Sequence, residues 1–207
     1  MPDTGAPYFI PFADPTDLVR DWPALSEDVA EAVADGLDAA GNAGIGSNVV
    51  QTVKTNVFTT SSTTYTDVTG LSVTITPSSA TSKILVIASV NMSTPGITGN
   101  NSIAAQITGG NANTYVGDAD GVRIRSAIGI IGKEFNAGSR DQLGNRQTAT
   151  SQPIVILDSP STDTPVTYQV QVLVNHATGS VNRVQNNANQ DFEFRSPSSI
   201  MAIEVAT

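Results

Sequence analysis

Residues 71–92 read LSVTITPSSATSKILVIASVNM, and this stretch decides the fold. Its first part, residues 71–76, alternates apolar and polar side chains without a slip, which is typical of a β-strand with one buried face. The turn residues Pro77, Ser78 and Ser79 end that strand. Residues 83–92 then form an almost continuous apolar run, which predicts a central strand buried on both faces.

The period of two continues through the rest of the chain. From residue 48 onward, short runs rich in Val, Ile and Thr are separated by Gly, Pro, Asn and Ser, and no helical pattern follows residue 41. This arrangement predicts an all-β head, an antiparallel, jelly-roll-like β-sandwich. The expected strands are residues 49–55, 63–68, 71–76, 83–92, 103–107, 154–157, 166–174, 192–194 and 200–205.

The first 41 residues differ in composition from the rest of the chain. They hold nine acidic side chains against one basic one, Arg20, so they carry −8 of the total net charge of −9. They also contain four of the eleven aromatic residues, Tyr8, Phe9, Phe12 and Trp22. A short acidic segment cannot bury such side chains in a core of its own, so we expect them to dock into another protein. We predict a docking arm and helix over residues 1–41, a linker over 42–47 and the head over 48–207.

A helix is expected to begin after Ser26, with Leu25 placed as a hydrophobic staple. Val29, Val33 and Leu37 recur at helical spacing and form a narrow apolar stripe. A helix of this kind is marginal alone in water. Its stripe packs either on the head of the same chain or against copies of itself around a symmetry axis, as a short trimeric bundle.

Few residues are suited to catalysis or to metal binding. The chain has no cysteine and a single histidine, His176, which follows a strand pattern and is expected to lie at a strand end. Residues 118–121 (DADG) resemble half of a calcium loop, but Gly129 stands where the bidentate Glu would be, so a tight turn is expected. The sequence predicts no enzyme, no cofactor and no metal.

The charge of the chain also excludes some partners. The pI near 4.3 and the lack of a basic cluster argue against nucleic-acid binding. No run reaches the roughly 20 apolar residues of a membrane span, and residues 1–5 have no features of a secretory signal. We therefore expect a protein made in a cytoplasm that interacts with other proteins.

Three segments and the last strand resemble a known group of proteins. Residues 49–55, 63–77 and 82–86, with the ending over residues 199–204, look like stretches of bacteriophage tail-fibre and minor tail proteins. The arm at residues 7–12, followed by residues 15–20, is similar to the virion-docking part of such proteins. The resemblance covers roughly residues 5–90 and the last strand, and its motifs are structural rather than chemical.

The resemblance implies a homotrimeric fibre or tail-tip spike of a phage virion that attaches to the host surface. Its arm would bind other virion proteins, in the tail or baseplate, and lysis would release the protein from the host cytoplasm. A close alternative is a head fibre or decoration protein on the capsid with the same architecture. A polysaccharide-degrading tailspike is less favoured, because no repeat period is present. A cellular carbohydrate-binding module would have no use for the arm.

Residues 109–150 form the least regular stretch and are the place for a receptor loop, although they could also cover the core or contact another subunit. The candidate receptor residues are Tyr115, Arg123, Arg125, Arg140 and Arg146. The four arginines are the one local concentration of positive charge, which makes an anionic host surface glycan a candidate ligand. Bridging of neighbouring subunits by these arginines is an equally open interpretation.

Overall fold

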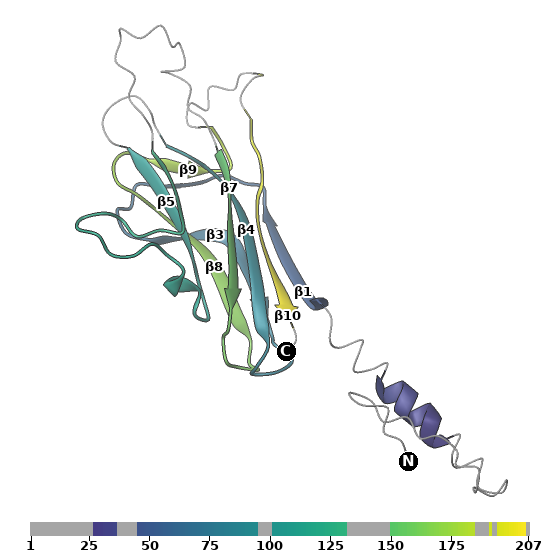
Figure 1. Ribbon diagram of the computed structural model, residues 1–207. Coiled ribbons are helices and arrows are strands. Elements are labelled where there is room, and N and C mark those ends of the chain that lie inside the picture. The colour runs from purple at the N-terminus through teal and green to yellow at the C-terminus, as the bar shows by residue number, and fades with distance from the viewer. Residues whose placement is uncertain are drawn as a thin grey trace, which may run out of the picture.

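The computed structural model of the chain describes residues 27–36, 45–94, 101–131, 150–184, 191 and 194–205, and of residues 45–47 it describes the backbone alone. A helix covers residues 27–36. Figure 1 shows the strands gathered into one β body. They are β1 (Ile45–Lys54), β2 (Phe58–Thr60), β3 (Thr66–Ile75), β4 (Lys83–Ser93), β5 (Ser102–Thr108), β6 (Ile128–Ile131), β7 (Thr150–Asp158), β8 (Val166–Val174), β9 (Gly179–Val181) and β10 (Ser198–Val205), with one 3-10 turn, η2 (Ala112–Thr114).

The strands form two antiparallel sheets. Sheet A has the order β1-β10-β4-β7, and the short strands β9 and β2 continue it from the end of β4. Sheet B has the order β3-β8-β5-β6. The chain changes sheet from β2 to β3, from β3 to β4, from β4 to β5, from β6 to β7, from β7 to β8 and from β8 to β9. Two four-stranded antiparallel layers connected in this way are a jelly roll, which confirms the predicted fold class.

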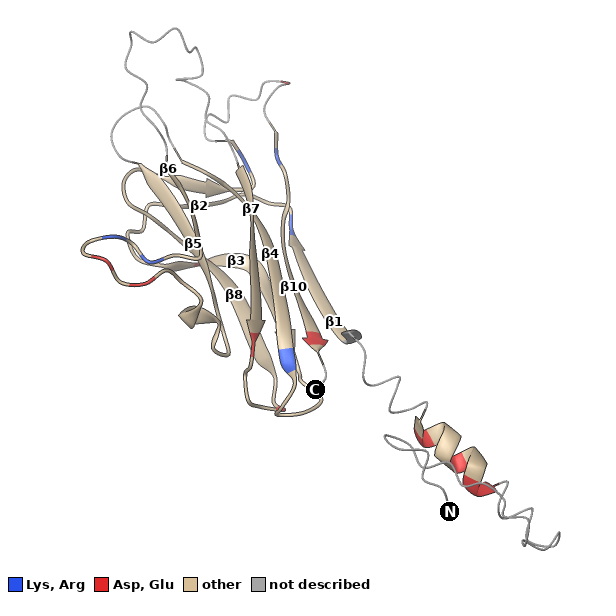
Figure 2. Cartoon of the chain, in the orientation of Figure 1, with Lys and Arg blue, Asp and Glu red and all other residues tan. Residues whose placement is uncertain are grey.

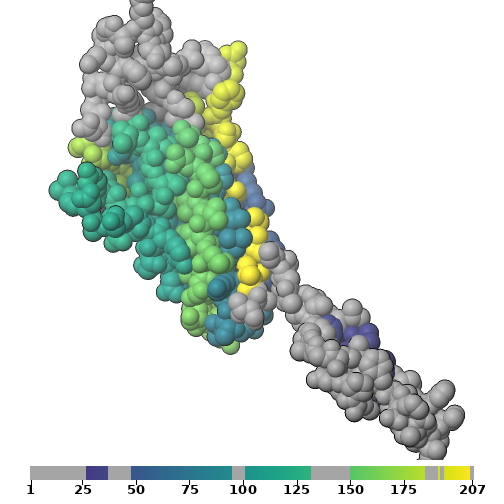
Figure 3. Space-filling model, viewed as in Figure 1, coloured from purple at the N-terminus to yellow at the C-terminus, as the bar shows by residue number. Residues whose placement is uncertain are grey.

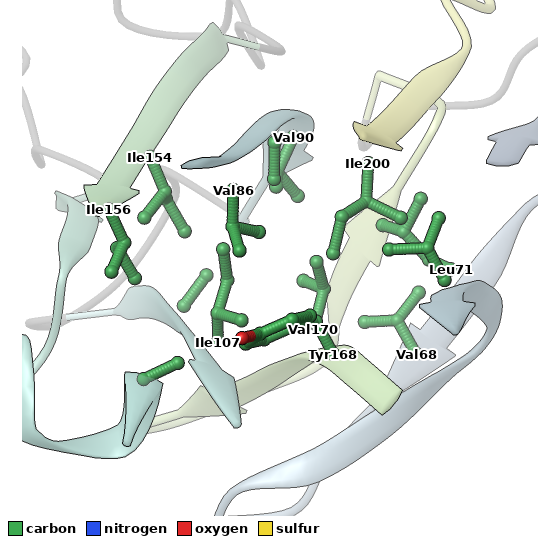
Figure 4. Packing of buried hydrophobic residues seen from close by; sticks show 14 of the residues in the cluster. Val68, Leu71, Val86, Val90, Ile107, Ile154, Ile156, Tyr168, Val170 and Ile200 are labelled. Atoms are coloured by element: carbon green, nitrogen blue, oxygen red, sulfur yellow. The ribbon is translucent and has the colours of Figure 1, made fainter. Parts of the chain in front are cut away.

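The core lies between the two sheets and consists of the residues that alternate inward along each strand. On β4, for example, Ile84, Val86 and Val90 are fully buried. Full burial of one aliphatic side chain of this size contributes about 1.5–3 kcal/mol. Figure 4 shows side chains from both layers gathered in one cluster with the ring of Tyr168, among them Val86, Ile107, Ile154, Ile156, Val170 and Ile200.

Strand β3 corrects one prediction. Residues 63–68 and 71–76 predict two strands, whereas the structure has a single strand that is interrupted by a bulge. Asp67 pairs with Gln171 but Ser72 already pairs with Gln169, and Gly70 lies in the bulge with φ of 81°. The amide nitrogen of Gln169 lies 3.0 and 3.1 Å from the carbonyl oxygens of Val68 and Leu71, so it satisfies backbone groups that the bulge removes from the ladder.

Other boundaries also differ from the prediction. In β4 the second face is half-exposed at Leu85 and Ile87, so the expected burial on both faces is wrong for the single chain. Of the predicted strand over residues 192–194 only Phe194 lies in the described residues, and it is outside any strand and 70% exposed. Strand β1 begins at Ile45, inside the predicted linker. The sequence did not indicate β2, β6 and β9, because three or four residues show too few alternations.

Candidate functional site

The loop between β5 and β6 covers residues 109–127 and carries three of the predicted receptor residues. It starts at Gly109 and Gly110, whose φ values are 112° and 50°. A Cβ at Gly109 would collide with the backbone carbonyl of Thr167, so the chain can turn away from β5 here only with glycine. After η2, the hydroxyl of Tyr115 donates to the carbonyl oxygen of Leu157 at 2.8 Å. This bond fastens the loop to β7, the edge strand of sheet A.

A second tyrosine holds the returning half of the loop. The hydroxyl of Tyr65, just before β3, donates to the carbonyl oxygen of Arg125 at 2.7 Å. Burial raises the pKa of Tyr65 to about 12, so this hydroxyl keeps its proton and remains a donor at neutral pH. The backbone N–H of Gly117 also donates to Ser126 at 3.2 Å. The loop is therefore tied at both of its ends, and the segment between the ties is presented to solvent.

The exposed segment, residues 118–124, is called the loop tip below. The side chain of Val122 is fully exposed and that of Ile124 is 43% exposed. Arg123 forms an ion pair with Asp120, and both side chains are exposed. Figure 2 shows acidic residues on one arm of this protruding loop and basic residues on the other. The tip thus combines paired charges of both signs with two apolar side chains, which suits a polar, wet contact with an apolar centre.

The arginines of the tip region have partners inside the loop. Arg123 is paired with Asp120, and the Nε of Arg125 donates to the carbonyl oxygen of Gly117 at 2.6 Å. An exposed ion pair contributes about 0–1 kcal/mol, so a ligand can exchange it at little cost. The sequence indicated Tyr115, Arg123 and Arg125 as candidate contact residues, but it did not indicate Val122 and Ile124. Apolar residues in an irregular stretch give no signal that separates exposed side chains from buried ones.

The structure brings only some of the predicted site residues together. Tyr115, Arg123 and Arg125 belong to the one loop, whereas Arg140 and Arg146 lie outside the described residues. Val29 and Val33 lie on the helix over residues 27–36, where Val29 is partly buried and Val33 is 45% exposed. Also outside the described residues are Tyr8, Phe9, Phe12, Trp22, Leu25 and Leu37.

The residues considered for metal binding occupy surface turns. His176 lies in the exposed turn between β8 and β9, which confirms its expected place at a strand end. Residues 118–121 form the exposed turn of the loop tip, in which the N–H of Arg123 donates to the carbonyl of Asp120. Within the described ranges, no group of three or more His, Cys, Asp or Glu side chains could hold a metal ion. Among those residues no helix has the length and apolar character to cross a membrane.

Two buried carboxylates lie at one end of the sandwich. Glu204 on β10 and Asp158 on β7 both pair with Ile84 of β4, from opposite sides, and both are buried. Glu204 accepts hydrogen bonds from the backbone N–H and the hydroxyl of Ser78, at 2.7 and 2.6 Å. Asp158 accepts one from the backbone N–H of Asn111, 3.2 Å from each carboxylate oxygen. Each carboxylate holds a loop of one sheet against a strand of the other, which is a structural role.

Comparisons with known proteins return distant structural neighbours. No family model and no curated protein match the sequence. Among solved structures, a chain of the T=1 particles derived from infectious bursal virus has 10% identity and a TM-score of 0.30, covering 78% of this chain and 37% of that chain. A chain of the T13 particle of the same virus has 9% identity, a TM-score of 0.30, and coverage of 77% and 35%. The chain spans little more than a third of the length of these neighbours.

Proposed function

We propose that this chain is a structural component of a phage virion, a trimeric tail fibre or tail-tip spike that attaches the particle to its host. The observation that carries the proposal is the division of the chain into two unlike parts. An acidic N-terminal segment with aromatic side chains precedes a β-sandwich head that carries almost no net charge. One part is suited to docking and the other to presentation of loops.

The N-terminal segment supplies the docking part. Its helix carries Val33 with 45% of the side chain exposed, and its acidic residues include Glu27 and Asp28 in the first turn. A helix of ten residues is unstable alone in water, so it needs partners for its apolar stripe. Copies of the same helix around a threefold axis would supply them, and the aromatic residues of the arm would then bind another virion protein.

The head supplies the presenting part. Jelly rolls serve as viral capsid and lectin domains, which is an analogy at the level of the fold. The loop tip, with Val122 and Arg123, is held out from the sandwich by the bonds of Tyr65 and Tyr115. In a trimer three tips act together, so contacts that are weak singly become strong through effective concentration. Non-enzymatic adsorption fits such a surface, and an anionic glycan is one ligand that Arg123 and Arg125 could bind.

The same architecture would serve on a capsid as a head fibre or decoration protein. The two placements differ in the protein to which the N-terminal segment binds. Electron microscopy of particles labelled with gold at the C-terminus of this chain separates them. Label at the tail tip supports host attachment, label over the capsid supports the alternative, and particles without label contradict a virion role.

Docking through the arm has a separate test. Replacing Phe9 and Phe12 with Ala should reduce incorporation of the protein into particles without changing the thermal unfolding of the head. Phe194→Ala is the matched control, because Phe194 is an exposed aromatic residue of the head. Normal incorporation of the Phe9 and Phe12 variant would contradict docking through these side chains.

A further inference from the structure

The outer faces of the two sheets differ in character. On sheet B most of the outward side chains are polar, and several of them are bonded to one another. Ile131 on β6, which is 75% exposed, is an apolar exception. The amide of Gln106 donates to Gln171 at 3.0 Å, and that of Gln171 donates to Asp67 at 2.7 Å. The hydroxyls of Thr74 and Thr167 lie 2.8 Å apart. This is the polar face that an antiparallel sheet turns to water.

Sheet A departs from that rule. The register of its four long strands aligns its outward residues in rows across β1, β10, β4 and β7. In two neighbouring rows, seven of the eight residues are apolar. A third row beside them contributes two more apolar residues, Val53 and Pro153. The first row consists of Val49, Ile203, Leu85 and Leu157, and the second of Gln51, Met201, Ile87 and Val155. We call these rows the outer apolar face.

Charge is almost absent from the outer apolar face. Each of the four strands contains one charged residue, and those of β1, β7 and β10 are inward and buried. Only Lys83, at the beginning of β4, is exposed. Figure 2 shows these charges at the strand ends, and Figure 3 shows β7, β4 and β10 side by side on the surface between them. A surface made only to face water would carry more charge than this.

In the single chain this face is partly exposed at its centre, on β4 and β10, and more exposed along its edge strands, β1 and β7. Val155 is 62% exposed, Val49 is 49% exposed and Leu157 is 45% exposed. With strands about 4.8 Å apart and a rise of about 3.4 Å per residue, three rows on four strands cover roughly 400 Å². A stable protein interface buries about 800 Å² on each partner, with an apolar core inside a polar rim. The outer apolar face has the size of such a core.

A second copy of this chain is the partner that these features favour. The head, residues 42–207, carries a net charge of only −1, so copies of it can approach one another, most easily through an uncharged surface. The outer apolar face is such a surface. The helix over residues 27–36 is a second incompletely buried apolar element, only eight residues before β1, the edge strand of this face. An assembly of identical chains would cover both elements at once.

We propose that the outer apolar face is the contact between the heads of a homo-oligomer. The contact explains why β4 is apolar on both sides: Ile84 and Val86 fill the core of one head, while Leu85 and Ile87 pack against the next head. It provides the head-to-head contact of the trimer in the proposed function, and it can be tested on purified protein without any virion. A negative result in this test would contradict the contact between heads, whereas a negative result in the labelling of particles would contradict the virion role, so the two failures can be told apart.

The test uses the absence of cysteine from the chain. Val155→Cys places a single thiol on the outer apolar face, and Thr74→Cys places one on the exposed outer face of sheet B. Full-length protein is reacted with a maleimide, and its mass is measured by light scattering under the same conditions. We expect an oligomer in which the thiol of Val155→Cys reacts about ten-fold more slowly than that of Thr74→Cys, since its access requires the subunits to separate.

A second substitution identifies what covers the thiol. Ile87→Lys adds a charge at the centre of the face and should separate the subunits. In this variant the thiol of Val155→Cys should react as fast as that of Thr74→Cys. Gln106→Lys adds the same charge to sheet B and should leave the reaction of Val155→Cys slow. Circular dichroism checks that all variants are folded. Fast reaction of Val155→Cys in the otherwise unaltered oligomer would overturn the proposal. Slow reaction in a monomer would also overturn it, because a segment of the same chain would then cover the face.

Discussion

The hydroxyl of Tyr168 donates a hydrogen bond to the Oδ2 atom of Asp158 at 2.7 Å, and neither side chain is exposed to solvent. Tyr168 belongs to β8 of sheet B and Asp158 ends β7 of sheet A, so the bond joins the two layers of the sandwich. Burial, and then the neighbouring carboxylate, raise the pKa of Tyr168, which keeps the hydroxyl protonated as a donor.

Loss of this hydroxyl should destabilise the head. Tyr168→Phe keeps the ring in the core but leaves the buried Oδ2 atom of Asp158 with only the longer bond from the N–H of Asn111, so the free energy of unfolding should fall by about 1–3 kcal/mol. Urea titration followed by circular dichroism measures it. Tyr65→Phe is the control: Tyr65 is only partly buried, and its hydroxyl bonds to a backbone carbonyl near the surface, where water can replace it. An equal loss in both variants would contradict a special role for the buried pair.

Glu204 should make the stability of the head depend on pH. Burial alone would raise the pKa of Glu204, but hydrogen bonds from Ser78, Ser82 and Asn48 outweigh burial and lower it. A carboxylate whose pKa is lower in the folded than in the unfolded chain contributes stability above the unfolded value of about 4.3. This contribution is lost as the pH falls through the folded pKa.

The measurement is the unfolding temperature between pH 7 and pH 3, for the unaltered protein and for Glu204→Gln. The variant should be less stable at pH 7, because its amide cannot accept all the hydrogen bonds that the carboxylate receives, and it should lose less stability on acidification. Parallel curves for the two proteins would show that other carboxylates dominate the response.

The turn after β5 should tolerate no side chain at Gly110. Its φ is 50°, and a Cβ there would collide with the Oδ2 atom of Asp158. Gly110→Ala should therefore lower the free energy of unfolding by roughly 1–3 kcal/mol, through strain and through displacement of the buried carboxylate. Gly117→Ala is the matched control, because no atom lies within 4 Å of its Cβ position. Chemical denaturation compares the two variants, and a similar loss in both would contradict this account of Gly110.

The fold was largely predictable because most strands obey their period. The expected strand over residues 166–174 coincides with β8, whose alternation is long and regular. Prediction failed where the alternation of apolar and polar residues is interrupted. At Gly70 a bulge interrupts it, so the sequence predicts two strands where the structure has one. It also failed for β4, because the apolar pattern does not say whether the covering layer belongs to the same chain. The pattern indicated two covered faces, and the single chain covers one.

The candidate site was less predictable for a different reason. Arginine residues in a Gly-rich stretch can be identified from the sequence as candidate ligand contacts, and Arg123 and Arg125 do lie on an exposed loop. The exposure of Val122 depends on the ties made by Tyr65 and Tyr115, which join residues far apart in the sequence. The burial of Asp158 and Glu204 arises in the same way, since loops from the opposite sheet cover acidic residues at strand ends that would otherwise face water.

The loop tip should determine adsorption if it contacts the host. Val122→Ser with Arg123→Ala removes the exposed apolar side chain and the charge of the tip, while the ties of Tyr65 and Tyr115 remain. A loss of about 1 kcal/mol at each head becomes about 3 kcal/mol when three heads bind together, which is on the order of a hundred-fold in adsorption affinity. The rate of particle adsorption to host cells measures the effect. His176→Ala alters another exposed turn and should have no effect, and unchanged adsorption of the tip variant would exclude this loop as the receptor contact.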